Sequence, residues 1–226
     1  MVILRRSRAW LALLLALSAA APAQTVRVVS SQALPVPSTV RGATHDLRLS
    51  LYGFAGTRWA AADIVAAVLE ASTLLAQCGV ALAGADLRML EAPRRFHFYA
   101  TPVSRSLLRE LNVPRPAIFF VEDSRNDPAF DAEAIGRGNA ATRPELADTV
   151  WVAHGARDLG VALAHELVHL LSDSGAHSDT PGNLMRPDTA PGNHHLSGEQ
   201  CRRMRERGAA TGLLAPRDAA APTDGK

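Results

Sequence analysis

The sequence predicts an α+β fold, a twisted mixed sheet packed on two main helices with a small C-terminal part. Short runs typical of strands are interleaved with an early helical stretch at 58–78. A second helical stretch at 159–171 is apolar on nearly all sides, which predicts that it is buried. The 226 residues are enough for one domain with a full hydrophobic core.

The first part of the chain is expected to hold two strands and a long helix. Residues 25–30 and 44–52 have the composition of strands, and in the second of them leucines alternate with polar residues. Residues 58–78 are expected to be helical because apolar side chains recur at helical spacing from Ile64 to Cys78, where Gly79 stops the helix.

The rest of the chain is expected to alternate short strands with helices. The expected elements are strands at 87–90, 95–99, 116–121 and 149–154, a helical turn at 104–111, the central helix at 159–171 and a last helix at 197–206. Residues 134–139 fit either an edge strand or a glycine loop, and both remain open. Ser197 and Gln200 have the spacing of a capping box. The composition after residue 214 predicts a disordered tail at 215–226.

The N-terminus has the features of a secretory signal. Three arginines between residues 5 and 8 precede an apolar run at 10–21, and an Ala-Pro-Ala cleavage sequence ends at residue 23. We therefore expect a signal peptide at 1–23, export to the periplasm or the extracellular space, and no membrane association of the mature form. The formal net charge of +2, with scattered arginines, gives no sign of a nucleic-acid partner.

The central helix carries the sequence His165-Glu166-Leu167-Val168-His169. Positions i and i+4 lie on one face of a helix, so the two imidazoles can bind one zinc ion. Glu166 lies beside that face, where its carboxylate can act as a general base on a zinc-bound water. Because the surrounding residues are apolar, the three polar side chains need partners, and a metal ion would satisfy them.

The residues that follow resemble the metzincin clan of zinc metalloendopeptidases, and its matrixin-like branch in particular. The resemblance lies in Gly175, His177 and the Leu184-Met185-Arg186-Pro187 segment, which is similar to a third ligand followed by a Met-turn. It implies a zincin catalytic domain, here residues 24–214, with zinc held by His165, His169 and His177. It also implies that Met185 is the Met-turn residue under the ligands and that an extended peptide pairs with an edge strand above the cleft.

The turn after the second histidine departs from the family. Its pattern is H-x-x-G-x-x-H, whereas here His177 follows His169 by eight residues and Ser172 stands at the glycine position. A two-residue insertion explains the change, with Gly175 expected to supply the bend. Asp173 and Asp179 are the competing third ligands, because carboxylates also bind zinc.

Cys78 and Cys201 are the two cysteines of the chain. In an exported protein such a pair suggests one disulfide bond, and the alternative is two independent buried thiols.

These observations predict an exported, monomeric zinc endopeptidase acting on peptides or proteins, with Zn²⁺ as cofactor and Glu166 as base. A zinc-stabilised binding domain on the same scaffold, with little or no catalytic activity, is the alternative. The altered turn motivates that alternative, and the presence of Glu166 opposes it, since a structural zinc needs no base. A third possibility is an immunity or inhibitor protein, for which the sequence offers no support.

Overall fold

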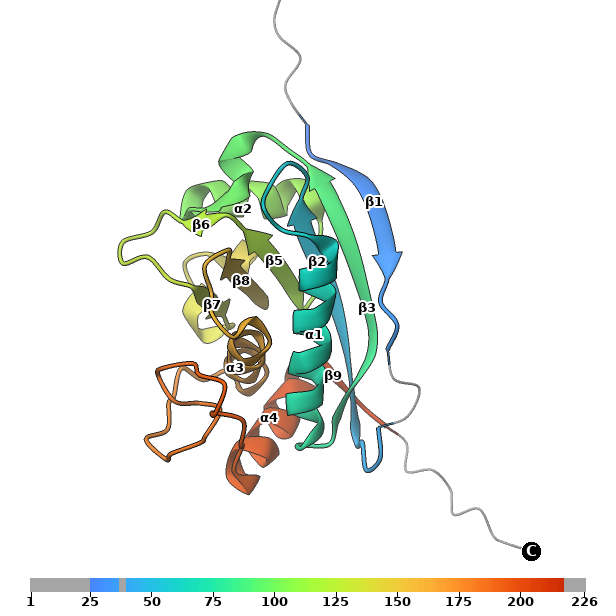
Figure 1. Cartoon of the computed structure of the whole chain (residues 1–226), viewed down its shortest axis with the longest axis vertical. Coiled ribbons are helices and arrows are strands. Elements are labelled where there is room, and N and C mark those ends of the chain that lie inside the picture. Colours follow the sequence, from blue (N-terminus) through green and yellow to red (C-terminus); the bar gives the residue numbers. More distant parts are fainter. Residues whose placement is uncertain (1–24, 37–39, 218–226) are drawn as a thin grey trace, which may run out of the picture.

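The computed structural model describes residues 25–36 and 40–217, which form one main sheet flanked by helices on both faces (Figure 1). The helices are α1 (Ala61–Ala76), α2 (Thr101–Leu111), α3 (Leu159–Ser172) and α4 (Gly198–Thr211), with short 3₁₀ helices η1 (Arg94–His97), η2 (Gly138–Ala140) and η3 (Pro144–Leu146). The strands of the main sheet are β1 (Arg27–Ala33), β2 (His45–Phe54), β3 (Val80–Glu91), β5 (Ala117–Val121), β7 (Ala132–Ile135), β8 (Thr149–Ala153) and β9 (Leu214–Pro216). A separate pair is formed by β4 (Phe98–Tyr99) and β6 (Asp123–Ser124).

The sheet is mixed, and its strand order is β1-β3-β2-β5-β8-β7. The four central strands β3, β2, β5 and β8 are parallel to one another, whereas the edge strands β1 and β7 run antiparallel to them. Strand β9 also pairs antiparallel with β2, at His45–Leu47, while β5 pairs with β2 further along, at Ser50–Tyr52. The segment after α4 is thus part of the sheet.

Alternation along the strands divides the core into two layers. In β5, Ile118 and Phe120 pack in the layer with α1 and α3, whereas Phe119 and Val121 pack in the opposite layer, which includes the buried leucines of α2. Trp151 of β8 stacks on Phe119 in that opposite layer, with ring centroids 4.4 Å apart. Both faces of the central strands are covered, which explains why β5 and β8 are buried at every position.

Most of the expected elements are present, with shifted ends. The helix expected at 58–78 begins at Ala61 and ends at Ala76, and the turn expected at 104–111 is a full helix from Thr101. The predicted capping box of α4 is confirmed, because the Ser197 hydroxyl accepts from the Gln200 N–H and the Gln200 side chain accepts from the Ser197 N–H. Of the two interpretations of 134–139, a strand is present only at Ala132–Ile135, and a 3₁₀ turn follows it.

Three expectations about strands were wrong. Strand β3 begins at Val80 rather than at 87, because pairing with β2 on one side and β1 on the other overrides the weak strand preference of its Ala-Gly segment. The strand expected at 95–99 is largely the 3₁₀ helix η1, which follows Pro93. Residues 215 and 216 were assigned to a disordered tail, but they pair with β2 in strand β9. Residues 218–226 and the expected signal peptide at 1–23 lie outside the described residues.

Candidate metal centre

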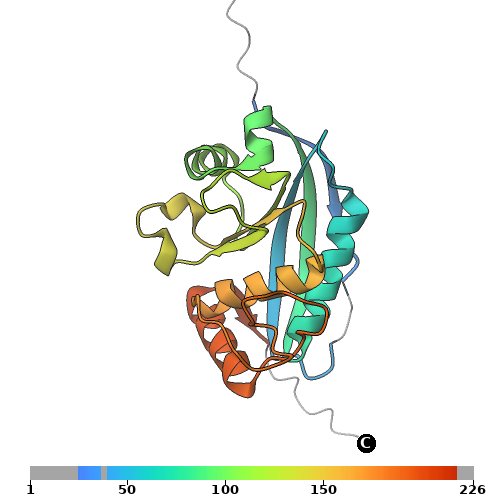
Figure 2. The same cartoon turned by 60° about the vertical axis from the view of Figure 1, so that its left-hand side comes forward.

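Helix α3 crosses the molecule between strand β7 and helix α4 (Figure 2). It is buried over most of its length and packs closely on α1 through Gly160, where an added Cβ would lie 2.6 Å from the Glu70 Cβ. Both helix ends are set by aspartates in the left-handed region, Asp158 (φ 51°) and Asp173 (φ 46°). Asp173 is the C-cap, and its N–H donates to the carbonyls of His169 and Leu170.

The structure brings His165, His169 and His177 together at the face of α3 opposite its core stripe. The Nε2 atom of His169 lies 2.9 Å from that of His165 and 3.3 Å from that of His177. Nitrogens on a tetrahedral zinc ion with bonds of ~2.0–2.1 Å are about 3.3 Å apart. The spacing therefore suits one small cation between the three rings.

The hydrogen bonds of the other ring nitrogens support the same conclusion. His165 Nδ1 lies 2.8 Å from the Leu184 carbonyl, and His169 Nδ1 lies 2.6 Å from the Ser174 carbonyl. A carbonyl only accepts, so both Nδ1 atoms carry the proton and both Nε2 atoms present bare lone pairs to each other. Burial lowers the pKa of His165, and it lowers the pKa of His169 to about 4, and both shifts favour the neutral form of the ring. Facing lone pairs need a cation, and the three histidines could hold a metal ion.

Glu166 lies next to the histidines and is held from the opposite wall of the site. Its Oε2 accepts a 2.7 Å hydrogen bond from the backbone N–H of Ala134 in the edge strand β7. The carboxyl packs against protein on most sides while part of the residue remains exposed, and burial raises its pKa to about 7. A carboxyl group with a pKa near neutrality can both accept and return a proton there.

A cleft of about 420 Å³ surrounds these groups. Its walls are the edge strand β7 with the glycine segment that follows, the exposed face of α3, and the loop after α3. The lining residues include Glu133, Ala134, Gly136, His165, Glu166, His169, Asp173, His177 and Pro187. The cleft is large enough for a segment of an extended peptide.

The loop that carries His177 returns below the histidines through a turn at Leu184 and Met185. Both residues are buried, and the Met185 carbonyl accepts from the Ser178 N–H, next to His177. The Met185 N–H donates to the Asn183 side chain at 2.9 Å. One turn therefore holds two of the three rings, His165 through the Leu184 carbonyl and His177 through its neighbour Ser178.

The bend after the second histidine is made differently from the sequence expectation. Gly175 is not in the left-handed region, and the residue that turns the chain is Asp173. The Asp173 carboxylate does not point to solvent: Oδ1 accepts from the Gly138 N–H at 3.1 Å, and Oδ2 lies 3.3 Å from an Arg207 nitrogen in α4. At Gly136 an added Cβ would lie only 2.9 Å from Asp173 Oδ1, so the absence of a side chain there makes room for the carboxylate. Asp173 thus joins three elements, which the inserted turn allows.

Asp179 contributes through its backbone. Its carbonyl accepts a 3.1 Å hydrogen bond from Arg186, and the metal-ligand cluster found among the described residues includes neither Asp173 nor Asp179.

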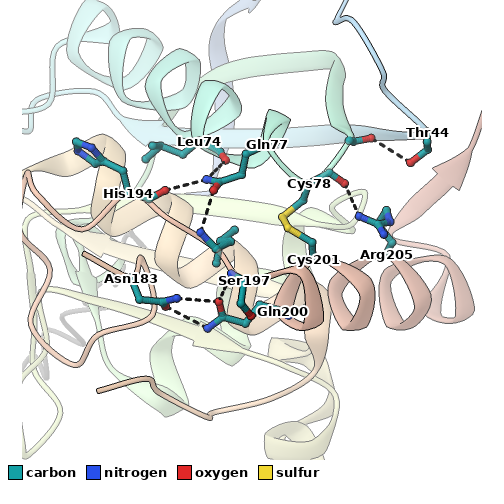
Figure 3. Close-up of a disulfide and its surroundings, with 12 residues drawn as sticks. Thr44, Leu74, Gln77, Cys78, Asn183, His194, Ser197, Gln200, Cys201 and Arg205 are labelled. Carbon is teal, nitrogen blue, oxygen red and sulfur yellow. Dashed lines mark hydrogen bonds between the residues drawn. A yellow bond between two sulfur atoms is a disulfide. The ribbon is translucent and has the colours of Figure 1, made fainter. Parts of the chain in front are cut away.

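Cys78 and Cys201 form the disulfide bond that the sequence suggested, with Cα atoms 4.9 Å apart (Figure 3). The bond joins the end of α1 to the first turn of α4. In the described ranges, no helix is both long and apolar enough to cross a membrane.

Two contributors to the site were missed from the sequence. Ala134 acts through its backbone N–H, and only its place opposite Glu166 on an edge strand reveals it. Gln77 reaches the loop of the third histidine from a position 117 residues earlier, and no local pattern indicates that contact.

No family model matches this chain, and no curated protein matches it. Among solved structures, the crystal structure of metalloproteinase-II from Bacteroides fragilis is similar, with a TM-score of 0.50 and 19% sequence identity over 78% of this chain. This chain spans 57% of the length of that protein. The described part of the chain thus has a mixed α/β fold, with one main sheet and four α-helices, that is similar to the fold of this metalloproteinase.

Proposed function

We propose that this protein is a zinc-dependent endopeptidase of the metzincin clan, similar to the matrixin branch. The observation that carries the proposal is the set of three converging Nε2 atoms with Glu166 beside them, on a fold similar to that of a metalloproteinase. The same proposal includes export of the protein, a monomeric state and a peptide or protein substrate. It also includes the subdomain layout of the clan. The disulfide bond is consistent with an oxidising compartment.

His165, His169 and His177 would hold the metal ion. A zinc ion held by these residues would supply Lewis acidity for the hydrolysis of a peptide carbonyl. Glu166 accepts the proton of the attacking water and then delivers it to the amine of the departing product. The Ala134 N–H keeps the carboxylate in place for both transfers, because a hydrogen bond fixes its position and favours its charged form.

The substrate is proposed to lie along β7. In an antiparallel pair, successive residues direct their N–H and C=O groups alternately toward and away from the partner strand. The Ala134 N–H points away from β8, toward Glu166, so the backbone groups of Ala132 share that outward direction. These edge groups, together with the cleft beneath them, suit an extended peptide backbone.

The first test is Glu166→Gln, with Glu166→Ala as a second variant. We expect both to retain one zinc per chain by emission spectroscopy and to lose nearly all cleavage of a peptide library, because the base is removed and the ligands stay. Full activity in either variant would contradict the mechanism. A wild-type protein that binds zinc but cleaves nothing would favour the alternative, a zinc-stabilised binding domain.

The second test addresses the third ligand. His177→Ala is expected to lower zinc affinity sharply, whereas Asp173→Asn and Asp179→Ala are expected to change it much less. Asparagine is chosen at 173 because it tolerates the left-handed backbone and still accepts from Gly138. Zinc competition with a chromogenic chelator measures all three, and a larger loss in an aspartate variant than in His177→Ala would overturn the ligand assignment.

A further inference from the structure

The end of α1 is bonded to the segment that follows the Met185 turn. The Gln77 side chain uses both ends of its amide: Nε2 donates to the His194 carbonyl at 2.8 Å, and Oε1 accepts from the Leu196 N–H at 2.9 Å (Figure 3). The same Nε2 also lies 2.6 Å from the Leu74 carbonyl in its own helix. Gln77 is exposed, so its amide forms these contacts at the surface rather than in the core.

The segment that Gln77 holds is itself paired with the turn beside the histidines. The N–H groups of His194 and His195 both donate to the Gly182 carbonyl at 3.0 Å, and the Leu184 N–H donates to the His195 carbonyl at 2.7 Å. The carbonyl of Leu184 in turn accepts from His165. A continuous series of hydrogen bonds thus runs from Gln77 to a ring of the metal centre.

A second glutamine anchors the same turn from α4. Gln200 and Asn183 form a reciprocal pair, in which each amide donates to the other, at 2.9 and 3.1 Å. The Asn183 oxygen also accepts from the Met185 N–H. Gln77 directly precedes Cys78, and Gln200 directly precedes Cys201. The disulfide bond therefore fixes the two helix ends that carry these amides relative to each other (Figure 3).

We propose that Gln77 is a positioning residue for the metal centre, which holds the turn at Leu184 and Met185 so that His165 and His177 keep their orientation. This inference rests on the proposed metal-binding function. The role requires a primary amide, because one group must both donate to His194 and accept from Leu196. Groups that hydrogen-bond directly to metal ligands change the metal affinity by about 10–100-fold when replaced, and Gln77, which acts through the Leu184 turn, is expected to lie at the low end of that range.

The test compares Gln77→Met and Gln77→Glu with the wild-type protein. Methionine keeps the length of the side chain and loses both hydrogen bonds. Glutamate still accepts from Leu196 but cannot donate to His194. Gln32→Met on the exposed strand β1 is the matched control, since the structure gives Gln32 no side-chain hydrogen bond among the described residues. The readouts are the rate of Zn²⁺ transfer to a chelating dye and the visible absorption spectrum of the Co²⁺-substituted protein.

We expect Gln77→Met to release Zn²⁺ about tenfold faster than the wild type and to change the Co²⁺ spectrum. Gln77→Glu should lie between the two, and Gln32→Met should match the wild type. Thermal unfolding of the metal-free variants should stay near that of the wild type, because Gln77 is exposed.

Wild-type release rates and spectra in both Gln77 variants would overturn the inference while leaving the proposed function intact. A wild-type chain that binds neither ion would overturn the proposed function, and the inference with it.

Discussion

The hydrogen bond between the Ala134 N–H and Glu166 can be removed almost alone by Ala134→Pro. Proline lacks the N–H group, and in strand β7 this particular N–H points to Glu166 and not to β8. The ladder between the two strands is therefore kept, and an edge strand accepts proline where the missing donor faces away from its partner. Glu133, the preceding residue, is already in the extended backbone that proline requires.

The expected effect follows from the charge of the acceptor. A hydrogen bond to a charged group contributes about 1.5–3 kcal/mol. If that energy positions the base during proton transfer, kcat falls roughly 10- to 150-fold, since each 1.36 kcal/mol is about a factor of ten. KM should change far less, because the substrate contacts of the cleft are untouched.

The assay is steady-state cleavage of a quenched fluorescent peptide, with Ala132→Pro as the matched control. Ala132 has the same outward-facing backbone on the same strand, and its N–H does not reach Glu166 but lies where the substrate is proposed to pair, so Ala132→Pro should raise KM and leave kcat nearly unchanged. A similar kcat loss in both proline variants would show that the strand itself was disturbed. An unchanged kcat in Ala134→Pro would refute the positioning role of this N–H.

Three further predictions concern stability. Gly160→Ala should lower the free energy of unfolding by about 1–3 kcal/mol, because its Cβ would overlap Glu70 and separate α3 from α1. Glu145→Gln should remove an acid-dependent contribution: hydrogen bonding to Arg105 lowers the pKa of Glu145 to about 2, so its stabilisation is full above pH 4.5 and is lost as the pH falls toward 2. Cys78→Ser should cost about 2–5 kcal/mol by removing a disulfide that closes a long loop.

Each of these predictions has a measurement that can contradict it. Chemical denaturation of Gly160→Ala is compared with Gly198→Ala, where an added Cβ meets no atom within 4 Å, and equal stabilities would contradict the close packing. For Glu145→Gln, parallel stability curves of wild type and variant between pH 4.5 and 2 would exclude the Arg105 interaction. For Cys78→Ser, stability equal to that of the oxidised wild type would mean that the bond contributes nothing.

Local periodicity predicted the helices and strands whose own sequence has a continuous apolar pattern. Helices α1 and α3 and strands β2, β5 and β8 have continuous apolar patterns, and the H-E-x-x-H spacing alone placed two rings on one helix face. The third ring required the family resemblance, since no helical spacing relates His177 to the other two. Its role as a metal ligand stays a prediction.

The features that sequence reasoning missed depend on contacts between distant segments. The first half of β3 is Ala-Gly rich, and only its two neighbouring strands define it. Asp173 was considered as a competing metal ligand, but its carboxylate contacts Gly138 and Arg207, and its left-handed backbone turns the chain after α3. Gly136 and Gly138 were expected in an edge strand or a glycine loop, and nothing in the sequence named Asp173 as the group that lies against them.

The position of β9 has a consequence for the order in which the molecule can be completed. Leu214–Pro216 pair with the start of β2, some 170 residues earlier in the chain (Arg217 and Asp46 are 171 apart). While the chain is being synthesised, a nascent chain without α4 and β9 has Cys78 unpaired and Asn183 without Gln200. Contacts of such high sequence separation form late, because loop closure must precede them. The turn that orients His165 and His177 is therefore secured only after the last helix has emerged, so the three histidines reach their final arrangement at the end of folding.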